Sequence, residues 1–150
     1  MRDHRKLGAG VGLIGLFGQF GGLIDVNLDA QNSAQVGFGR GYGYNTFFTA
    51  WKNSFEGQFL SPYITLGYSR WYNSMSDDLR GNSYVLDQVL SNDELSQGKI
   101  GVDFLMANVG FQYNQLDSDW IGNSFFAEFN FLFSTARGHF IPAASIGSIY

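Results

Sequence analysis

Apolar and polar side chains alternate along much of this chain. This period of two restricts its fold more than any other feature. Residues 23–29 read LIDVNLD, so an extended strand would place Ile24, Val26 and Leu28 on one face and Asp25 and Asn27 on the other. Similar alternation recurs at residues 35–44, 47–56, 63–72, 105–114 and 124–133. A glycine-rich strand near residues 7–18 and a terminal strand at 141–150 bring the total to about eight. The sequence therefore predicts an all-β, antiparallel fold.

The polar faces of these strands contain few charges. Lys, Arg, Asp and Glu make up 15% of the chain, against about 25% in typical soluble domains. A soluble sheet turns its polar face to water. In a membrane barrel the apolar face meets lipid, the small polar face lines the lumen, and strands of about ten residues cross the bilayer. The composition thus favours an up-and-down transmembrane β-barrel.

The segment at residues 124–133 has the most apolar face of all. We predict that Phe125, Phe129, Phe131 and Phe133 on this face contact lipid. Aromatic residues near the strand ends would form the girdles at the two membrane interfaces: Tyr42, Tyr44, Trp51, Tyr63, Trp71, Tyr72, Tyr113 and Trp120. The alternative is a soluble lipocalin-like barrel, in which the same phenylalanines would surround an apolar ligand.

Charged residues of the strands are predicted to lie in the lumen, because an Arg or Lys facing lipid near the midplane costs about 2–4 kcal/mol. The predicted lumen charge network is Asp25, Asp29, Arg40, Lys52, Glu56 and Glu128. Arg40 shares its parity with Val36 and Phe38 rather than with the intervening glycines. We nevertheless expect it in the lumen, paired with Asp25 or Glu128. An eight-stranded barrel is just wide enough for its own side chains, so a wide pore is excluded.

Residues 73–99 interrupt the strand pattern with a long, acidic loop. The spacing of Val85, Leu86, Val89 and Leu90 predicts a short amphipathic helix within it. Connections of this length are uncommon unless they are functional. We predict that this loop docks a protein partner or mediates adhesion; the alternative is that the four apolar residues pack on the barrel rim.

Composition does not change along the chain, so residues 1–150 are predicted to form one β-barrel domain with a disordered terminus at residues 1–6. This basic start and the apolar stretch that follows imitate a signal peptide or a membrane helix. Seven glycines between residues 8 and 22 argue against both.

Several functional classes are excluded by residue counts. The chain has no Cys and two His, so no metal site or cofactor is expected. Its net charge of −4 does not suit nucleic-acid binding, which needs a concentrated basic face. No catalytic residues are assigned, and we expect a non-enzymatic protein.

Taken together, these strands resemble the small bacterial outer-membrane β-barrels, the class that includes the transmembrane domain of outer-membrane protein A and the opacity-type surface proteins. The resemblance covers nearly the whole chain and is carried by its strand pattern. It implies a location in the bacterial outer membrane, contact with the lipid bilayer and lipopolysaccharide, and recognition of the last strand by the barrel-assembly machinery. Ala144, Ile146, Ser148 and Tyr150 match that terminal signal in part, with Ser148 where an apolar residue is usual.

The same resemblance leaves one enzymatic alternative open. Some lipid-A deacylases of this class use His, Ser and Glu on the barrel face, which would place His139 beside Ser134 and Glu128 in a lipid-modifying outer-membrane enzyme. The H-x-S spacing of those enzymes is missing here, since Phe140 and Ile141 follow His139.

Overall fold

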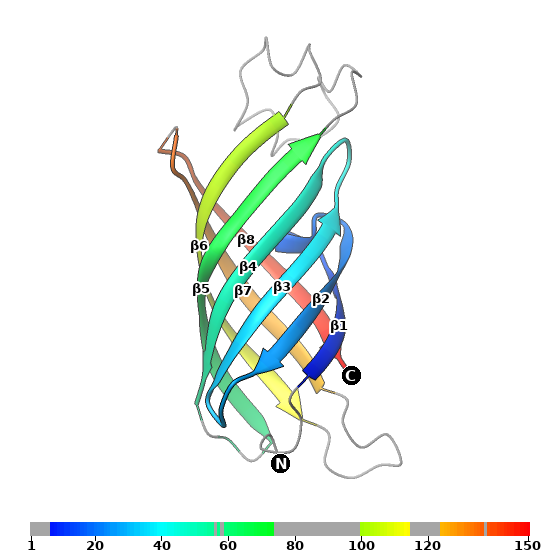
Figure 1. Ribbon diagram of the computed structural model, residues 1–150, viewed down its shortest axis with the longest axis vertical. Helices are drawn as coiled ribbons and strands as arrows, with labels where there is room; N and C mark the ends of the chain where they lie inside the picture. Colours follow the sequence, from blue (N-terminus) through cyan, green and yellow to red (C-terminus); the bar gives the residue numbers. More distant parts are fainter. Residues whose placement is uncertain (1–6, 56, 58, 74–99, 115–123, 137) are drawn as a thin grey trace.

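The computed structural model describes residues 7–55, 57, 59–73, 100–114, 124–136 and 138–150. Eight antiparallel strands close into a barrel, and each strand pairs with its neighbours in chain order (Figure 1). The strands are β1 (Leu7–Leu13), β2 (Phe20–Asn27), β3 (Asn32–Arg40), β4 (Asn45–Ser54), β5 (Leu60–Asn73), β6 (Ile100–Asn114), β7 (Ser124–Ser134) and β8 (Phe140–Ile149). The predicted fold class is confirmed. The helix predicted at residues 85–90 and the terminus at 1–6 lie outside the described residues.

The barrel closes where β8 pairs with β1. Four residue pairs join the two strands, from Gly10 opposite Ile149 to Leu13 opposite Ile146. Beyond them, the backbone N–H groups of Ala9 and Tyr150 each donate to the carbonyl of the other residue, at 3.1 and 2.7 Å. Closure matters because an unpaired strand edge inside a bilayer would leave backbone polar groups without partners.

The strands differ in length. β1 has 7 residues, whereas β5 and β6 have 14 and 15. The β5–β6 ladder runs from Leu60 opposite Tyr113 to Asn73 opposite Ile100. These two strands reach furthest at the end opposite to the one at which β1 begins and β8 ends (Figure 1). The longest connection, residues 74–99, joins their ends.

Between β1 and β2 the chain enters the lumen of the barrel. Residues 14–19, which we call the inward segment, contain the 3-10 helix η2 (Gly15–Phe17), where Leu16 and Phe17 are almost fully buried. Its backbone adopts positive φ at Ile14 (64°), Gly15 (58°) and Gly18 (69°), which is unusual for a β-branched residue such as Ile14. The predicted first strand at residues 7–18 therefore ends early. Among the described residues, no helix is long and apolar enough to cross a membrane.

A row of glycines in the wall makes room for the inward segment. Gly147, Gly12, Gly21 and Gly39 are paired neighbours across β8, β1, β2 and β3, so they form one continuous level of the barrel. A Cβ atom at Gly12 would overlap the Phe17 ring, and one at Gly39 would overlap the Phe17 backbone. These glycines thus leave the space that Phe17 occupies.

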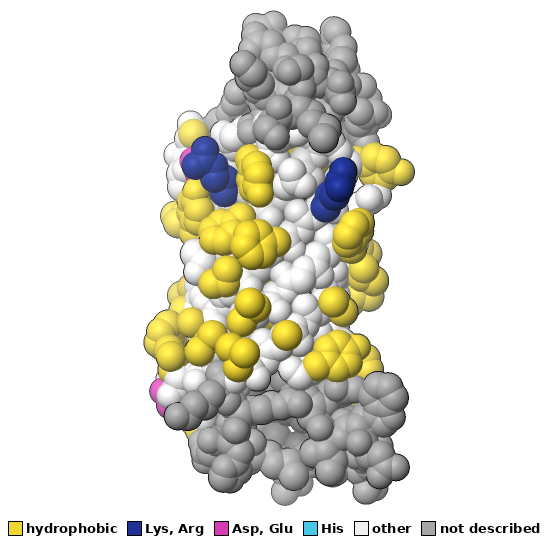
Figure 2. Space-filling view, turned by 45° about the vertical axis from the view of Figure 1, so that its right-hand side comes forward, with side chains coloured by type: hydrophobic (Ala, Val, Ile, Leu, Met, Phe, Trp, Pro, Cys, Tyr) yellow, Lys and Arg dark blue, Asp and Glu magenta, His cyan; other side chains and the backbone are white. Residues whose placement is uncertain are grey.

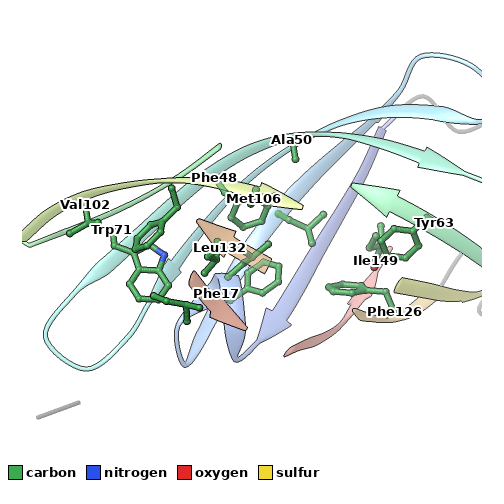
Figure 3. Close-up of a cluster of buried hydrophobic side chains, with 14 residues drawn as sticks. Phe17, Phe48, Ala50, Tyr63, Trp71, Val102, Met106, Phe126, Leu132 and Ile149 are labelled. Carbon is green, nitrogen blue, oxygen red and sulfur yellow. The ribbon is translucent and has the colours of Figure 1, made fainter. Parts of the chain in front are cut away.

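Inside the barrel, apolar side chains form a cluster that follows the lumen (Figure 3). Phe17 lies near its centre, with its ring centroid 5.3 Å from that of Phe48 in an edge-to-face arrangement and 6.2 Å from that of Phe126. Toward the end at which β5 and β6 extend furthest, the ring centroids of Trp71 and Phe104 lie 5.0 Å apart. The sequence did not predict this apolar component of the lumen.

Candidate functional site: an apolar outer belt around a filled lumen

Exposed apolar side chains on all eight strands form an apolar belt around the outer surface of the barrel, and Figure 2 shows those on one face. Side chains of β7 alternate strictly between buried and exposed, because successive residues of a strand point to opposite faces. The structure places Phe125, Phe129, Phe131 and Phe133 on the outside, and Phe129 is 67% exposed. On β6 the outward residues include Leu105, Val109, Phe111 and Tyr113.

The height of this belt suits a bilayer. The apolar outward residues extend from 125 to 133 on β7 and from 105 to 113 on β6. At about 3.4 Å per residue these spans are roughly 27 Å along the strand, or about 21 Å along the barrel axis at a tilt near 40°. Membrane barrels have an apolar band of about 25 Å. The exterior therefore has the size as well as the chemistry of a lipid-facing surface.

This arrangement contradicts the soluble lipocalin-like alternative. A soluble carrier would hold the β7 phenylalanines inside, around a ligand cavity. Here they lie outside, and a cavity of about 10 Å³ beside Lys52 and Glu128 has room for about one water molecule. The polar side chains that would face water in a soluble protein, such as Asn108 and Asn130, are buried instead.

The aromatic residues predicted for the girdles divide between the two faces. Tyr42, Trp51, Tyr72 and Tyr113 are exposed on the outside. The girdle prediction is wrong for Tyr63 and Trp71, which are buried in the lumen because their parity on β5 matches that of Thr65 and Ser69. The Tyr44 ring stacks on that of Trp71, with the two ring centroids 5.0 Å apart. Tyr44 is partly buried there, and this burial raises the pKa of its phenol. Trp120 lies outside the described residues.

Lys52 on β4 is the centre of a polar network inside the barrel. Its side chain is 1% exposed, and Nζ donates a 2.7 Å hydrogen bond to Gln112 Oε1 on β6. Nζ also lies 3.6 Å from Asp25 Oδ2 on β2 and 4.2 Å from the centroid of the Tyr63 ring. Gln35 Nε2 donates to the same Asp25 oxygen at 3.1 Å. Groups from β2, β5 and β6 therefore contact this buried cation.

Glu128 on β7 belongs to the same network. Tyr63 Oη donates to Glu128 Oε2 and Asn130 Nδ2 to Glu128 Oε1, both at 3.0 Å. Tyr63 therefore contacts Lys52 through its ring and Glu128 through its hydroxyl group. The structure brings Asp25, Lys52 and Glu128 together in the lumen, as the sequence pattern proposed.

Two other members of the predicted network lie elsewhere. Asp29 is exposed in the β2–β3 turn, where its Oδ1 accepts from the backbone N–H groups of Gln31 and Asn32 at 2.8 and 2.7 Å. Arg40 is exposed at the end of β3, on the outer face shared by Val36 and Phe38. The lumen prediction for both residues is wrong: Asp29 lies beyond the strand, and Arg40 follows the strict alternation of β3. Glu56 lies outside the described residues.

The inward segment is hydrogen-bonded to this network. Thr46 Oγ1 on β4 donates to the Leu16 carbonyl at 2.7 Å, and the Leu16 N–H donates to Ser145 Oγ on β8 at 3.2 Å. Ser145 Oγ donates in turn to Asn130 Oδ1 at 2.6 Å, and Asn130 donates to Glu128. A continuous series of contacts therefore connects the backbone of the segment to the charged groups of the lumen.

The enzymatic alternative requires His139, Ser134 and Glu128 to meet. His139 is exposed in the β7–β8 connection, whereas Ser134 is fully buried on the inner face of β7. Glu128 lies six residues before Ser134 on the same strand, roughly 20 Å away along it. These three residues do not form a catalytic triad.

Comparison with known proteins gives a match of fold. No family model matches the chain, and no curated protein matches it. Among solved structures, the chain is similar to the N-terminal β-barrel domain of OprF from Pseudomonas aeruginosa, with a TM-score of 0.63, 16% sequence identity and 96% of each chain covered. The chain therefore has the β-barrel fold of that domain, which agrees at the level of fold with the small barrels that its strand pattern resembles.

Proposed function

We propose that this protein is a non-enzymatic β-barrel of the bacterial outer membrane that acts through its surface, with a lumen closed by its own side chains. The observation that carries the proposal is the inversion of polarity: an apolar belt outside, and a hydrogen-bonded polar network with a buried cation inside. An exposed apolar belt of this kind is unfavourable in water and favourable in contact with lipid.

The orientation follows from the connections. Outer-membrane barrels have short turns on the periplasmic side and longer loops outside the cell. The longest connection of this chain, residues 74–99, joins the end of β5 to the start of β6, and these strand ends lie opposite to the start of β1 and the end of β8. We assign that end to the extracellular side.

We further propose that residues 74–99 provide the functional surface, for adhesion or for docking a partner. β5 and β6, which carry this connection, are the longest strands and extend beyond the others. The connection includes Val85, Leu86, Val89 and Leu90, whose structure lies outside the described residues. Assembly through the terminal strand and its Tyr150 remains a prediction.

Two measurements test this proposal. Cell fractionation should find the native protein in the outer membrane, with a gel mobility that changes on heating. Replacing residues 74–99 by a short Gly/Ser connection should leave that heat-modifiable mobility intact while adhesion of cells that express the protein is lost. Recovery in the soluble fraction would refute the membrane assignment. Loss of the folded form in the replacement variant would instead assign these residues to packing on the rim.

A further inference from the structure

The exposed positive charges of the described residues gather at one end of the barrel. Of the Lys and Arg residues described, Lys52 lies in the lumen, whereas Arg40 and Arg70 are exposed on the outer surface. Figure 2 shows the Lys and Arg side chains at one height, near the end that we assign to the extracellular side, with apolar side chains beside and below them. At the opposite end, Asp29 contributes a negative charge.

Strand register places an aromatic pair beside the two arginines. Arg40 ends β3, and Phe38, two residues earlier, is opposite Phe47 of β4. Phe47 is in turn opposite Arg70 of β5. The rings of Phe38 and Phe47 have centroids 5.3 Å apart. We call these four residues the arginine surface. Neighbouring strands lie about 4.8 Å apart, so the axes of β3 and β5, which carry the two arginines, are about 10 Å apart.

An acidic residue adjoins this surface. Asp103 on β6 has its Oδ1 3.7 Å from Arg70 Nε, and the Tyr68 hydroxyl donates to the same oxygen. The side chains of Arg70 and Asp103 are 54% and 41% exposed, so the pair is open to its surroundings. The arginine surface and Asp103 together carry two positive charges and one negative charge. The excess favours an anion, and the planar guanidinium group suits phosphate oxygens in particular.

We propose that the arginine surface binds the phosphorylated headgroup of lipopolysaccharide, with phosphate groups on Arg40 and Arg70 and an acyl chain against Phe38 and Phe47. This inference rests on the proposed membrane location and orientation. Two features favour this glycolipid over a phospholipid. The cations lie at the end assigned to the outer leaflet, and two of them flank one aromatic pair, which suits a headgroup with two phosphates, whereas phosphatidylglycerol carries one.

The test is a binding measurement on the full chain, folded in zwitterionic detergent micelles. The probe is fluorescently labelled lipopolysaccharide with both headgroup phosphates, titrated with protein and followed by anisotropy. Arg40→Gln and Arg70→Gln should each weaken binding about fivefold, the effect expected for an exposed charge-assisted contact, and the double variant should weaken it further. Arg40→Lys and Arg70→Lys, which keep the charge but not the planar guanidinium group, should each lose less affinity than the matching Gln variant.

A matched control is available at the opposite end of the barrel. Gln31 is exposed in the β2–β3 turn, so Gln31→Glu changes the net charge by the same amount as one Arg→Gln substitution and should leave binding unchanged. The wild type should bind dephosphorylated lipopolysaccharide and phosphatidylglycerol more weakly than the intact glycolipid. Equal binding by the double variant, or equal affinity of the wild type for either comparison lipid, would overturn the inference. Heat-modifiable mobility, measured on the same samples before lipid is added, would reveal a failure of the proposed barrel separately.

Discussion

The free-energy contribution of Lys52 depends on its position inside the barrel. Nζ is enclosed by Asp25, Gln112 and the Tyr63 ring, with almost no exposed surface. Removing one partner of a buried ion pair leaves a charge without compensation, which typically costs 3–5 kcal/mol. Lys52→Met should therefore lower the free energy of unfolding by about 3 kcal/mol.

A second substitution separates the charge effect from packing. In a Lys52→Met background, Asp25→Asn removes the uncompensated carboxylate and should recover part of the lost stability. Thr49→Ala, on the outer face of the same strand, is the matched control and should change little. Urea titrations in detergent, read from the fraction with folded gel mobility, measure all four proteins. A Lys52→Met variant as stable as the wild type would show that the network does not stabilise the barrel.

Asp29 gives a prediction of pH dependence outside the membrane. Hydrogen bonds from the Asn32 side chain and then from the Gln31 and Asn32 backbone N–H groups hold the pKa of its carboxyl group below the ordinary value. A carboxylate with a lowered pKa in the folded state stabilises that state above its unfolded pKa, and this contribution is lost as the pH falls through the folded pKa. Stability should thus decline on acidification below about pH 4.

Asp29→Asn isolates this contribution, because the amide keeps an acceptor oxygen for the turn and does not titrate. The variant should show a smaller decrease in unfolding midpoint between neutral and acidic pH than the wild type. The midpoint of each protein is compared with its own midpoint at the other pH. Any contribution of the buried Glu128 is present in both proteins and therefore does not affect the difference between them. Identical pH profiles of the two proteins would contradict the role assigned to Asp29.

At the scale of the elements, the inward segment depends on the glycine row in the wall. A Cβ at Gly39 would overlap the backbone of Phe17, which cannot rotate away as a side chain does. Gly39→Ala should therefore displace the segment and destabilise the barrel by about 1–3 kcal/mol, the usual cost of overpacking. Gly22 on β2 is the matched control, since the nearest atom to its Cβ would be the Gly10 carbonyl oxygen at 3.7 Å. Gly22→Ala should remain within about 0.5 kcal/mol of the wild type.

Proteolysis adds a structural readout to this comparison. Displacement of the inward segment should make the chain near Leu16 and Phe17 accessible to a protease in the Gly39→Ala variant but not in Gly22→Ala. If both variants resist cleavage and unfold alike, the glycine row is not what seats the segment.

These elements also show what the sequence could and could not predict. The strands and their outward faces follow from a period of two, which local side-chain character reveals. The inward segment has no such periodicity, and its seat consists of four glycines that are neighbours only once the register of β8, β1, β2 and β3 is known. The lumen was predicted as purely polar because Phe48, Trp71 and Phe104 were not assigned to it.

For Arg40, the alternation of β3 predicts the correct face of the strand, whereas the argument from the cost of a lipid-facing charge predicted the wrong one. Arg40 shares the outward parity of Phe38, and its position at the end of β3 puts it beyond the belt, where a charge is tolerated. The expectation of a lumen position assumed that the strand carried Arg40 into the bilayer. Strand ends are the least certain part of a sequence-based assignment, and here one end decided the environment of the residue.

For the molecule as a whole, the inward segment and the charged network occupy successive levels of the same lumen. Phe17 contacts Phe48 and Phe126, while the cavity beside it reaches Lys52 and Glu128. Closure of the tube is therefore shared between an apolar level and a charged level, which are connected through Ser145 and Asn130. A barrel closed in this way should show little steady conductance in a planar bilayer.

Phe17→Ala should raise that conductance, because removing the ring leaves the space between Phe48 and Phe126 unfilled and open to water. Phe129→Ala removes a ring of the same size from the lipid-facing surface, so it controls for the loss of aromatic volume and should conduct like the wild type. The charged level still narrows the tube in Phe17→Ala, and combining it with Lys52→Met should increase the current beyond either single variant. Folded Phe17→Ala protein with wild-type conductance would mean that the charged level closes the barrel without help from the inward segment.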